Sequence, residues 1–248
     1  MKYLAIIALF ALALVAPAYA ETAHGTWTIS TERGEARLET HWSDGSGSHS
    51  NDSRDIDPQS LGIAQQLAGP SQRATFSLHR EAGDFAFEGW LGNNEGSGSF
   101  TFTPNDAFFN DLTKRGYTFD SMGTKMAFAT LDITMSYVNQ VEALGLKGET
   151  GHLIAMKALK VTPQYVHDLQ SAGVQGLEGS RIISLKALHV DSAFVNEIAA
   201  AGYPHLEANQ YVTLKAMHID GAYIKYLRDH GLKNLTINQI VSMKAQHI

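Results

Sequence analysis

Apolar and polar residues alternate with a period of two along the first part of the chain, from about residue 25 to residue 103. The clearest stretch is 98–103, where Phe100 and Phe102 alternate with serine and threonine. Such alternation, rich in β-branched and aromatic side chains, is typical of half-buried antiparallel strands. Breaks rich in Gly, Pro and Asn supply the turns. We predict five or six strands in a meander, with residues 43–57, dense in Ser, Gly, Asn and Asp, as a mobile loop or a polar edge strand.

At residues 104–106 the apolar period changes to 3.6, which predicts helices. The chain then repeats a short phrase, Met or Leu followed by Lys and Ala, four times at an interval of 29 residues. The lysines of this phrase are Lys157, Lys186, Lys215 and Lys244. Self-similarity at a fixed period of about 20 to 50 residues marks stacked supersecondary units. The second part of the chain is therefore predicted to be an α-helical solenoid of about five 29-residue, two-helix repeats.

The residues that begin and end the helices of the repeats support this prediction. In the best copy Thr162 is a helix N-cap, Pro163 occupies the first helical position and Gly173 ends the helix in the left-handed conformation. A second, short helix follows, for instance over residues 206–217. The equivalent closing glycines are Gly116, Gly145, Gly173, Gly202 and Gly231. In the last unit the polar Gln246 stands where earlier copies have leucine or methionine, as a solenoid cap requires.

The predicted fold class is therefore α+β, with an N-terminal antiparallel β-region at 21–104 and a C-terminal helical repeat region at 105–248. Residues 1–20 have the form of a signal peptide: Lys2, an apolar run over 4–15, and a small-x-small cleavage site at Ala18-Tyr19-Ala20. The run is shorter than the roughly 20 residues that span a bilayer. We expect cleavage near Glu21, no membrane span afterwards, and a periplasmic or secreted location in a bacterial envelope.

The composition of the chain argues against some classes of partner and some kinds of catalytic site. The chain has 19 Lys and Arg against 25 Asp and Glu, and without Lys2 the balance is 18 − 25 = −7. Such a charge argues against nucleic acid as a partner, because phosphates would be repelled. The absence of cysteine excludes disulfides and a thiol nucleophile. The usual metallopeptidase, serine-hydrolase and phosphate-loop motifs are also absent, so we predict a non-enzymatic protein without a cofactor and leave its oligomeric state open.

Repetition places equivalent side chains in rows. We name two of them: the lysine row described above, and the histidine row of His189, His218 and His247, which Lys160 precedes by one unit. Neighbouring units stack about 8–10 Å apart. Zinc needs its nitrogen ligands at about 2.0–2.1 Å, so we predict no metal site. The first interpretation is that both rows lie in the last turn of each second helix, where cations favour the helix dipole. The alternative is that the rows bind a partner, such as an anionic envelope polymer. The candidate binding residues are Lys157, Lys186, Lys215, Lys244, His189, His218 and His247.

Two further groups of residues in the β-region carry alternative functions. Trp27, Trp42 and Trp90 are expected in the core, with a glycan-binding platform as the alternative. The nearby carboxylates Glu81 and Asp84, with Glu88 on the following strand, are expected on a solvated hairpin. The alternative for them is an unrecognised hydrolase site at the junction of the two regions.

Four segments carry a family resemblance: DFAFEGW at 84–90, GSFTFTPN at 98–105, LKVTPQYV at 159–166 and SAG at 171–173. They resemble the extracytoplasmic C-terminal region of bacterial beta-lactam-sensor-like membrane metallopeptidase antirepressors. The chain shows neither the transmembrane helices nor the zinc-binding helix motif of that family, so peptidase activity is not carried over. The resemblance implies a periplasmic module for sensing or protein contact. We therefore expect an exported binding, sensing or scaffolding protein whose repeat surface contacts a protein or an anionic envelope polymer.

Overall fold

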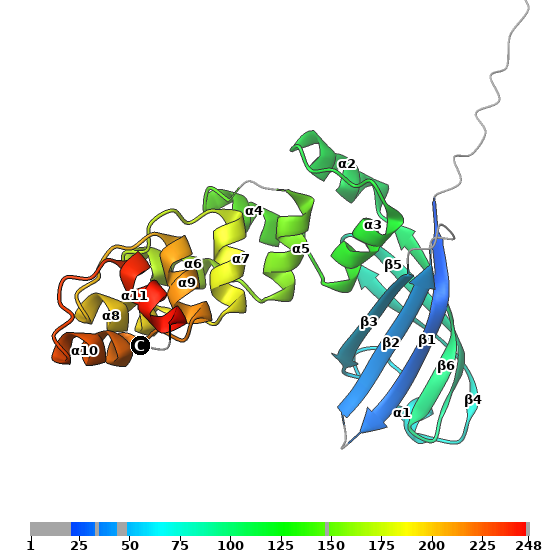
Figure 1. Ribbon diagram of the computed structural model, residues 1–248. Coiled ribbons are helices and arrows are strands. Elements are labelled where there is room, and N and C mark those ends of the chain that lie inside the picture. Colours follow the sequence, from blue (N-terminus) through cyan, green and yellow to red (C-terminus); the bar gives the residue numbers. More distant parts are fainter. Residues whose placement is uncertain (1–20, 33–34, 44–48, 147–148, 247–248) are drawn as a thin grey trace, which may run out of the picture.

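The computed structural model describes residues 21–32, 35–43, 49–146 and 149–246. The N-terminal region is one six-stranded antiparallel sheet in the order β3-β2-β1-β6-β5-β4 (Figure 1). Its strands are β1 Ala23–Glu32, β2 Glu35–Ser43, β3 His49–Ile56, β4 Gln72–Arg80, β5 Gly83–Gly92 and β6 Glu95–Pro104. A short helix, α1 (Ala64–Ala68), lies in the connection between β3 and β4.

The sheet order corrects the prediction of a simple meander. The chain makes two meanders of three strands each, and the first strand of one pairs with the last strand of the other, so β1 lies beside β6. Alternation tells which side chains share a face, but it does not tell which strands are neighbours. The stretch 43–57 contains the edge strand β3, as one of the two alternatives expected; residues 44–48 lie outside the described part.

One face of the sheet is apolar and buried, because the alternating aromatic residues of β1, β5 and β6 all point to it. Trp27 is fully buried there, and its indole N–H donates to the carbonyl oxygens of Glu88 (3.2 Å) and Ser99 (3.0 Å). Beside this site, strands β5 and β6 pair two glycines, Gly89 and Gly98. A Cβ on Gly98 would overlap the carbonyl oxygen of Glu88, so these strands approach at a distance that only glycine permits.

In the described residues after the sheet, 105–146 and 149–246, there are ten helices of nine residues each. They are α2 Asp106–Lys114, α3 Met122–Thr130, α4 Met135–Ala143, α5 Thr150–Ala158, α6 Pro163–Ser171, α7 Gly179–Ala187, α8 Ser192–Ala200, α9 Ala208–Ala216, α10 Gly221–Asp229 and α11 Ile237–Ala245. Helix α7 packs on α5 and α9, whereas α8 packs on α6 and α10. The array is thus a two-layered solenoid that extends away from the sheet (Figure 1).

The helices begin and end at the residues that the sequence predicts. Thr162 caps α6 by accepting a hydrogen bond from the backbone N–H of Tyr165, and Pro163 is its first residue. Five copies of this first helix exist: α2, α4, α6, α8 and α10. The glycine that follows each copy has a positive φ, between 74° and 104°, so the predicted left-handed closures are confirmed.

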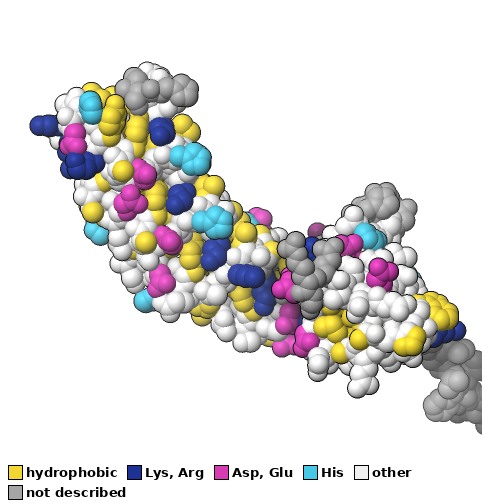
Figure 2. All heavy atoms as spheres, turned by 90° about the horizontal axis from the view of Figure 1, so that it is seen from below, with side chains coloured by type: hydrophobic (Ala, Val, Ile, Leu, Met, Phe, Trp, Pro, Cys, Tyr) yellow, Lys and Arg dark blue, Asp and Glu magenta, His cyan; other side chains and the backbone are white. Residues whose placement is uncertain are grey.

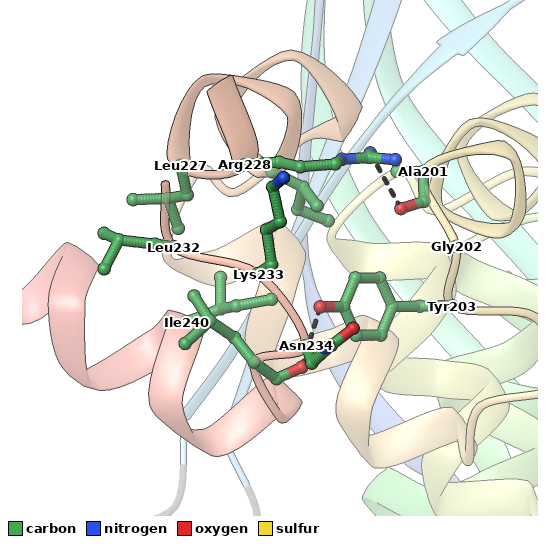
Figure 3. Close-up of a pocket in the computed structure, with 11 residues that line it drawn as sticks. Ala201, Gly202, Tyr203, Leu227, Arg228, Leu232, Lys233, Asn234 and Ile240 are labelled. Atoms are coloured by element: carbon green, nitrogen blue, oxygen red, sulfur yellow. Dashed lines mark hydrogen bonds between the residues drawn. The ribbon is translucent and has the colours of Figure 1, made fainter. Parts of the chain in front are cut away.

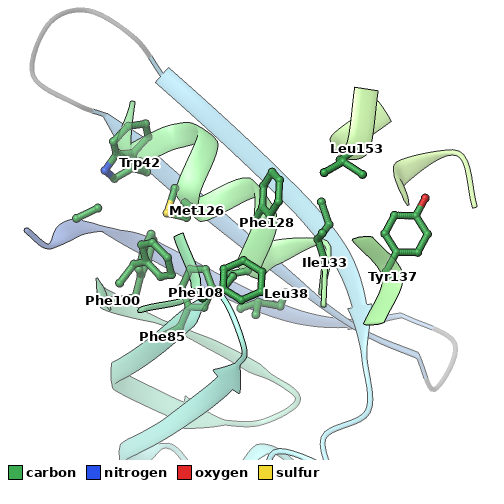
Figure 4. Close-up of a cluster of buried hydrophobic side chains, with 14 of the residues drawn as sticks. Leu38, Trp42, Phe85, Phe100, Phe108, Met126, Phe128, Ile133, Tyr137 and Leu153 are labelled. Atoms are coloured by element: carbon green, nitrogen blue, oxygen red, sulfur yellow. The ribbon is translucent and has the colours of Figure 1, made fainter. Parts of the chain in front are cut away.

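The sheet and the first repeats share one buried apolar cluster, which crosses the boundary at residue 104. Figure 4 shows Met126 and Phe128 of α3 beside Phe85 and Phe100 of the sheet, with Tyr137 of α4 farther along the cluster. The repeats are therefore not a separate body joined by a linker, since their first units complete the core of the sheet.

Polar contacts at helix ends fix this junction. Arg54 of β3 donates to the carbonyl oxygen of Thr130 at the end of α3, at 2.7 Å. The carboxylate of Glu81 accepts from the N–H of Met135 at the start of α4, also at 2.7 Å. A cation at a helix C-terminus and an anion at an N-terminus both complement the helix dipole. The β-region thus supplies a charge of the correct sign to the end of α3 and to the start of α4.

We predict that Gly98→Ala lowers the free energy of unfolding by about 2 kcal/mol, because the added methyl forces β5 and β6 apart. Chemical denaturation monitored by circular dichroism measures this. Gly151→Ala is the matched control: a Cβ at Gly151 meets nothing within 4 Å, and its helical position favours alanine. It should leave stability unchanged or slightly raised. Equal stability of the two variants would contradict the close approach at Gly98.

Candidate functional site

The lysine row is built from contacts between successive units. Lys157, Lys186, Lys215 and Lys244 all lie in the last turn of their helices, as predicted. Each ammonium group also lies over an aromatic ring of the preceding unit, at 4.8, 4.4, 4.4 and 4.3 Å from the ring centroid in chain order. The rings belong to Tyr137, Tyr165, Phe194 and Tyr223. A cation–π pair of this kind contributes about 0.5–1 kcal/mol at an exposed site.

The aromatic partners occupy one fixed helical position. Each is the third residue of its helix, and its backbone N–H donates to the N-cap side chain of Thr134, Thr162, Asp191 or Asp220. The contact between these rings and the lysines was not predicted from the sequence. The spacing that indicates it is nevertheless regular, because an aromatic residue stands 20 or 21 positions before every lysine of the row.

Two of the tyrosines have a second contact with the following unit. The hydroxyl of Tyr165 donates to the carbonyl oxygen of Val190 at 2.8 Å, and the hydroxyl of Tyr137 donates to that of Val161 at 3.4 Å. Burial raises the pKa of Tyr137 to about 12. Burial, and then the Asp191 carboxylate, raise the pKa of Tyr165 as well. Each of these rings is therefore held neutral between a lysine and a backbone carbonyl of the next unit.

The two described members of the histidine row, His189 and His218, lie outside the helices, which corrects the prediction that they belong to the last turn. His189 and His218 come after the C-cap, with φ of 55° and 52°, and Lys160 has the same conformation at 55°. The N–H of His189 donates to the carbonyl of Lys186, and the N–H of Val190 donates to that of Leu185, which is a Schellman closure. Glycine is the usual residue at such a position, so the sequence signal for it was absent. His247 lies outside the described residues.

The two rows together form a stripe on one face of the solenoid, which we call the basic stripe: Lys157, Lys160, Lys186, His189, Lys215, His218 and Lys244. Figure 2 shows Lys and His side chains following one another along this face, with a parallel line of acidic side chains next to them. The lysines of the row are half-buried, whereas Lys160, His189 and His218 are exposed. Within the described residues, no group of three His, Asp or Glu side chains is arranged to hold a metal ion.

The three tryptophans separate into two classes. Trp27 and Trp42 are buried in the core, as the first interpretation expects. Trp90 is 56% exposed, and it borders a shallow hollow that Thr28, Asn93 and Glu95 also line. Only Trp90 is accessible to a glycan.

The carboxylates of the β4–β5 hairpin and of the outer face of β5 take part in structural contacts. Glu81 binds the start of α4, and Glu88 accepts a hydrogen bond from the hydroxyl of Ser99. Asp84 pairs with Nδ1 of His79 at 3.0 Å, and Nε2 of that ring lies 3.0 Å from the hydroxyl of Ser77. This Ser–His–Asp chain has the hydrogen-bond order of a nucleophilic triad. However, the His79 and Asp84 side chains are 74% and 59% exposed, so water screens the pair and removes the low dielectric that such catalysis uses.

The raised pKa of Tyr137 predicts a loss of stability at alkaline pH. In the unfolded chain tyrosine ionises near about pH 10, whereas in the folded protein Tyr137 keeps its proton up to about 12. Its contribution is therefore complete below pH 10 and is lost as the pH rises through 12. We expect Tyr137→Phe to flatten the fall in unfolding free energy between these values, as measured by urea denaturation. An unchanged slope in Tyr137→Phe would contradict the buried phenol.

Residues 1–20, with the expected signal peptide, lie outside the described residues. In the described part of the chain, the helices are too short and too polar to cross a bilayer. No family model, curated protein or solved structure matches this chain. The family resemblance therefore stays an expectation.

Proposed function

We propose that the protein is an exported, non-enzymatic binding or scaffolding protein, and that its basic stripe contacts an anionic partner, either an acidic protein segment or an envelope polymer. One observation carries this proposal: four lysines occupy the same place in four successive units, and a ring of the neighbouring unit holds each of them. Export is inferred from the pattern of residues 1–20.

The rings favour binding because they order the lysines beforehand. A free lysine side chain has about 2 kcal/mol of rotamer entropy, part of which is lost when it binds a ligand. In the lysine row that ordering has already taken place on folding. Each of these lysines is only half-buried, and its ammonium group carries three N–H donors. The result is a line of cations at the spacing of the units, which suits an extended partner with repeated negative charge.

The charge of the stripe limits the strength of this contact. Five lysines give the stripe its positive charge. The carboxylates of Asp191 and Asp220, each two residues after a histidine of the stripe, reduce it. Both carboxylates accept a hydrogen bond from a helix N-terminus, at 2.9 and 2.8 Å, so part of their charge is offset there. We therefore expect a moderate affinity that salt weakens, since exposed charges are screened beyond about 8 Å at physiological ionic strength.

Replacing two central lysines tests the stripe. We predict that Lys186→Gln with Lys215→Gln weakens binding to long-chain polyphosphate, and that it lowers the slope of log affinity against log salt by about 2, one for each lost contact. Fluorescence anisotropy at several salt concentrations measures both quantities. The control is Lys114→Gln with Arg181→Gln, which changes the net charge equally at exposed positions outside the stripe. Equal losses in the two double variants would show that only net charge matters, and the proposal would fail.

A second candidate function is glycan binding at Trp90. The exposed indole is a flat apolar surface on the outer face of the sheet, where its neighbours across the strands are Arg73 and Ser97. An aromatic face next to amide, carboxylate and hydroxyl groups is a combination that suits a sugar ring. In this chain Asn93, Glu95 and Thr28 supply the polar groups.

For this candidate, we predict that soluble peptidoglycan fragments change the tryptophan fluorescence and that Trp90→Ala abolishes the change. The other two tryptophans are buried, so the response of the wild-type protein reports Trp90. Because Trp90 is exposed, the variant should unfold within about 0.5 kcal/mol of the wild type. A fluorescence change that persists in Trp90→Ala would exclude this site.

A further inference from the structure

The last two described units line a half-open pocket of about 330 Å³. Its apolar wall consists of Ile224 and Leu227 of α10, Leu232 and Leu235 of the following connection, and Ile240 of α11. Figure 3 shows the ring of Tyr203 on the opposite side and the side chain of Lys233 extending toward Arg228. The volume falls in the range of small-molecule sites, which begins at about 300 Å³.

A single substitution between repeats changes how the connections are joined here. One unit earlier, the N–H of Gln175 donates to the carbonyl of Leu206 at 3.0 Å and ties two successive connections together. The residue 29 positions after Gln175 is Pro204, which has no N–H to donate. The carbonyl of Leu235, equivalent to that of Leu206, accepts instead from the Tyr203 hydroxyl at 2.7 Å. A tyrosine side chain thus replaces a direct backbone bond between the two connections.

Two further differences leave the space empty. One unit earlier, His205 covers Gly173, with its Nδ1 only 2.6 Å from where a Cβ would stand. At the equivalent glycine, Gly202, no atom lies within 4 Å of the place where a Cβ would stand. The residue equivalent to His205 in the last unit is the shorter Asn234. In the same way the buried Tyr211 of α9 is followed in α11 by the smaller Ile240. Smaller side chains at both positions enlarge the pocket.

The rim of the pocket is cationic. Arg228 and Lys233 stand where the preceding unit has Ala199 and Pro204, and none of the described residues that line the pocket is acidic. Arg228 donates to the carbonyl of Ala201 at 3.1 Å, which leaves further guanidinium donors. The nearby Asp229 is paired with Lys225. Neither Arg228 nor Lys233 forms an ion pair with any residue that the structure describes.

From this combination we infer that the pocket binds a carboxylate carried on a short apolar chain. The cations at the rim pair with the carboxylate, and the aliphatic wall accommodates the chain. At about 30 Å³ for each non-hydrogen atom, the volume takes roughly ten such atoms. A free medium-chain acid and a peptide C-terminus with an apolar last residue both have this chemistry. The site is independent of the basic stripe.

Isothermal titration of the full chain with octanoate tests the inference, with octan-1-ol as the uncharged comparison. We expect octanoate to bind with a Kd on the order of 1 mM and octanol at least tenfold more weakly. Arg228→Gln with Lys233→Gln should raise the Kd for octanoate about tenfold, since both positions are exposed and the fold does not depend on their charge. Lys114→Gln should have no effect. Equal binding of acid and alcohol, or no heat from octanoate, would overturn the proposal.

A second variant fills the pocket from within. Asn234→His with Ile240→Tyr restores the two side chains of the preceding unit, so it should abolish octanoate binding without removing either cation. If this variant does not fold, the charge variants still decide the question. A peptide ending in leucine, compared with its C-terminal amide, distinguishes the two sources of the ligand. Tighter binding of the peptide acid indicates a chain terminus, and tighter binding of octanoate indicates a free acid. Stripe variants should leave both affinities unchanged.

Discussion

The repeat array depends on packing between successive units: buried apolar side chains form the interior of the array, and a lysine over an aromatic ring of the preceding unit recurs beside them. A nine-residue helix is too short to be stable alone in water, so each helix relies on its neighbours. The capped helix start places the ring, and the last turn of the next unit supplies the cation. In two units a phenol hydroxyl adds a bond to a backbone carbonyl. The aromatic residue next to each helix cap is thus also the one that contacts the next unit. At the four interfaces with this contact, successive units are therefore aligned in the same way.

The same arrangement explains why the lysine row serves both stability and binding. Each lysine of the row contacts a ring of the preceding unit and remains half-exposed. Folding therefore fixes the positions of the charges before any partner arrives. The neighbouring histidines have no such role in packing, since they occupy an exposed position just after the helix.

Much of the fold could be predicted from sequence because its signals are local. Period-two alternation identified the strands, and Thr162, Pro163 and Gly173 identified a helix with its ends. Strand order was not predictable, because pairing of β1 with β6 depends on contacts between distant segments. The left-handed histidines were missed because glycine is the usual indicator of that conformation. The aromatic partners of the lysine row were missed because a ring and its lysine come from different units.

The candidate sites differ in the same respect. The rows were visible as repeats, whereas the exposure of Trp90 depends on which face of the sheet the core covers. The pocket arises from departures from the repeat, at Pro204, Asn234 and Ile240. The residues that the units share form the array, whereas the residues in which the last unit differs from its neighbour form the pocket.

The array has unequal ends. Its first units are joined to the sheet through a common core and through Arg54 and Glu81, whereas α11 packs on α9 and lacks a following helix among the described residues. In a chain of nearest-neighbour interfaces, each unit is stabilised by the neighbours on which it packs. The units next to the sheet share its core, so they should be the last to open locally and should show the slowest amide exchange. The pocket lies between the last two described units, so a ligand bound there would join them in addition to their own packing.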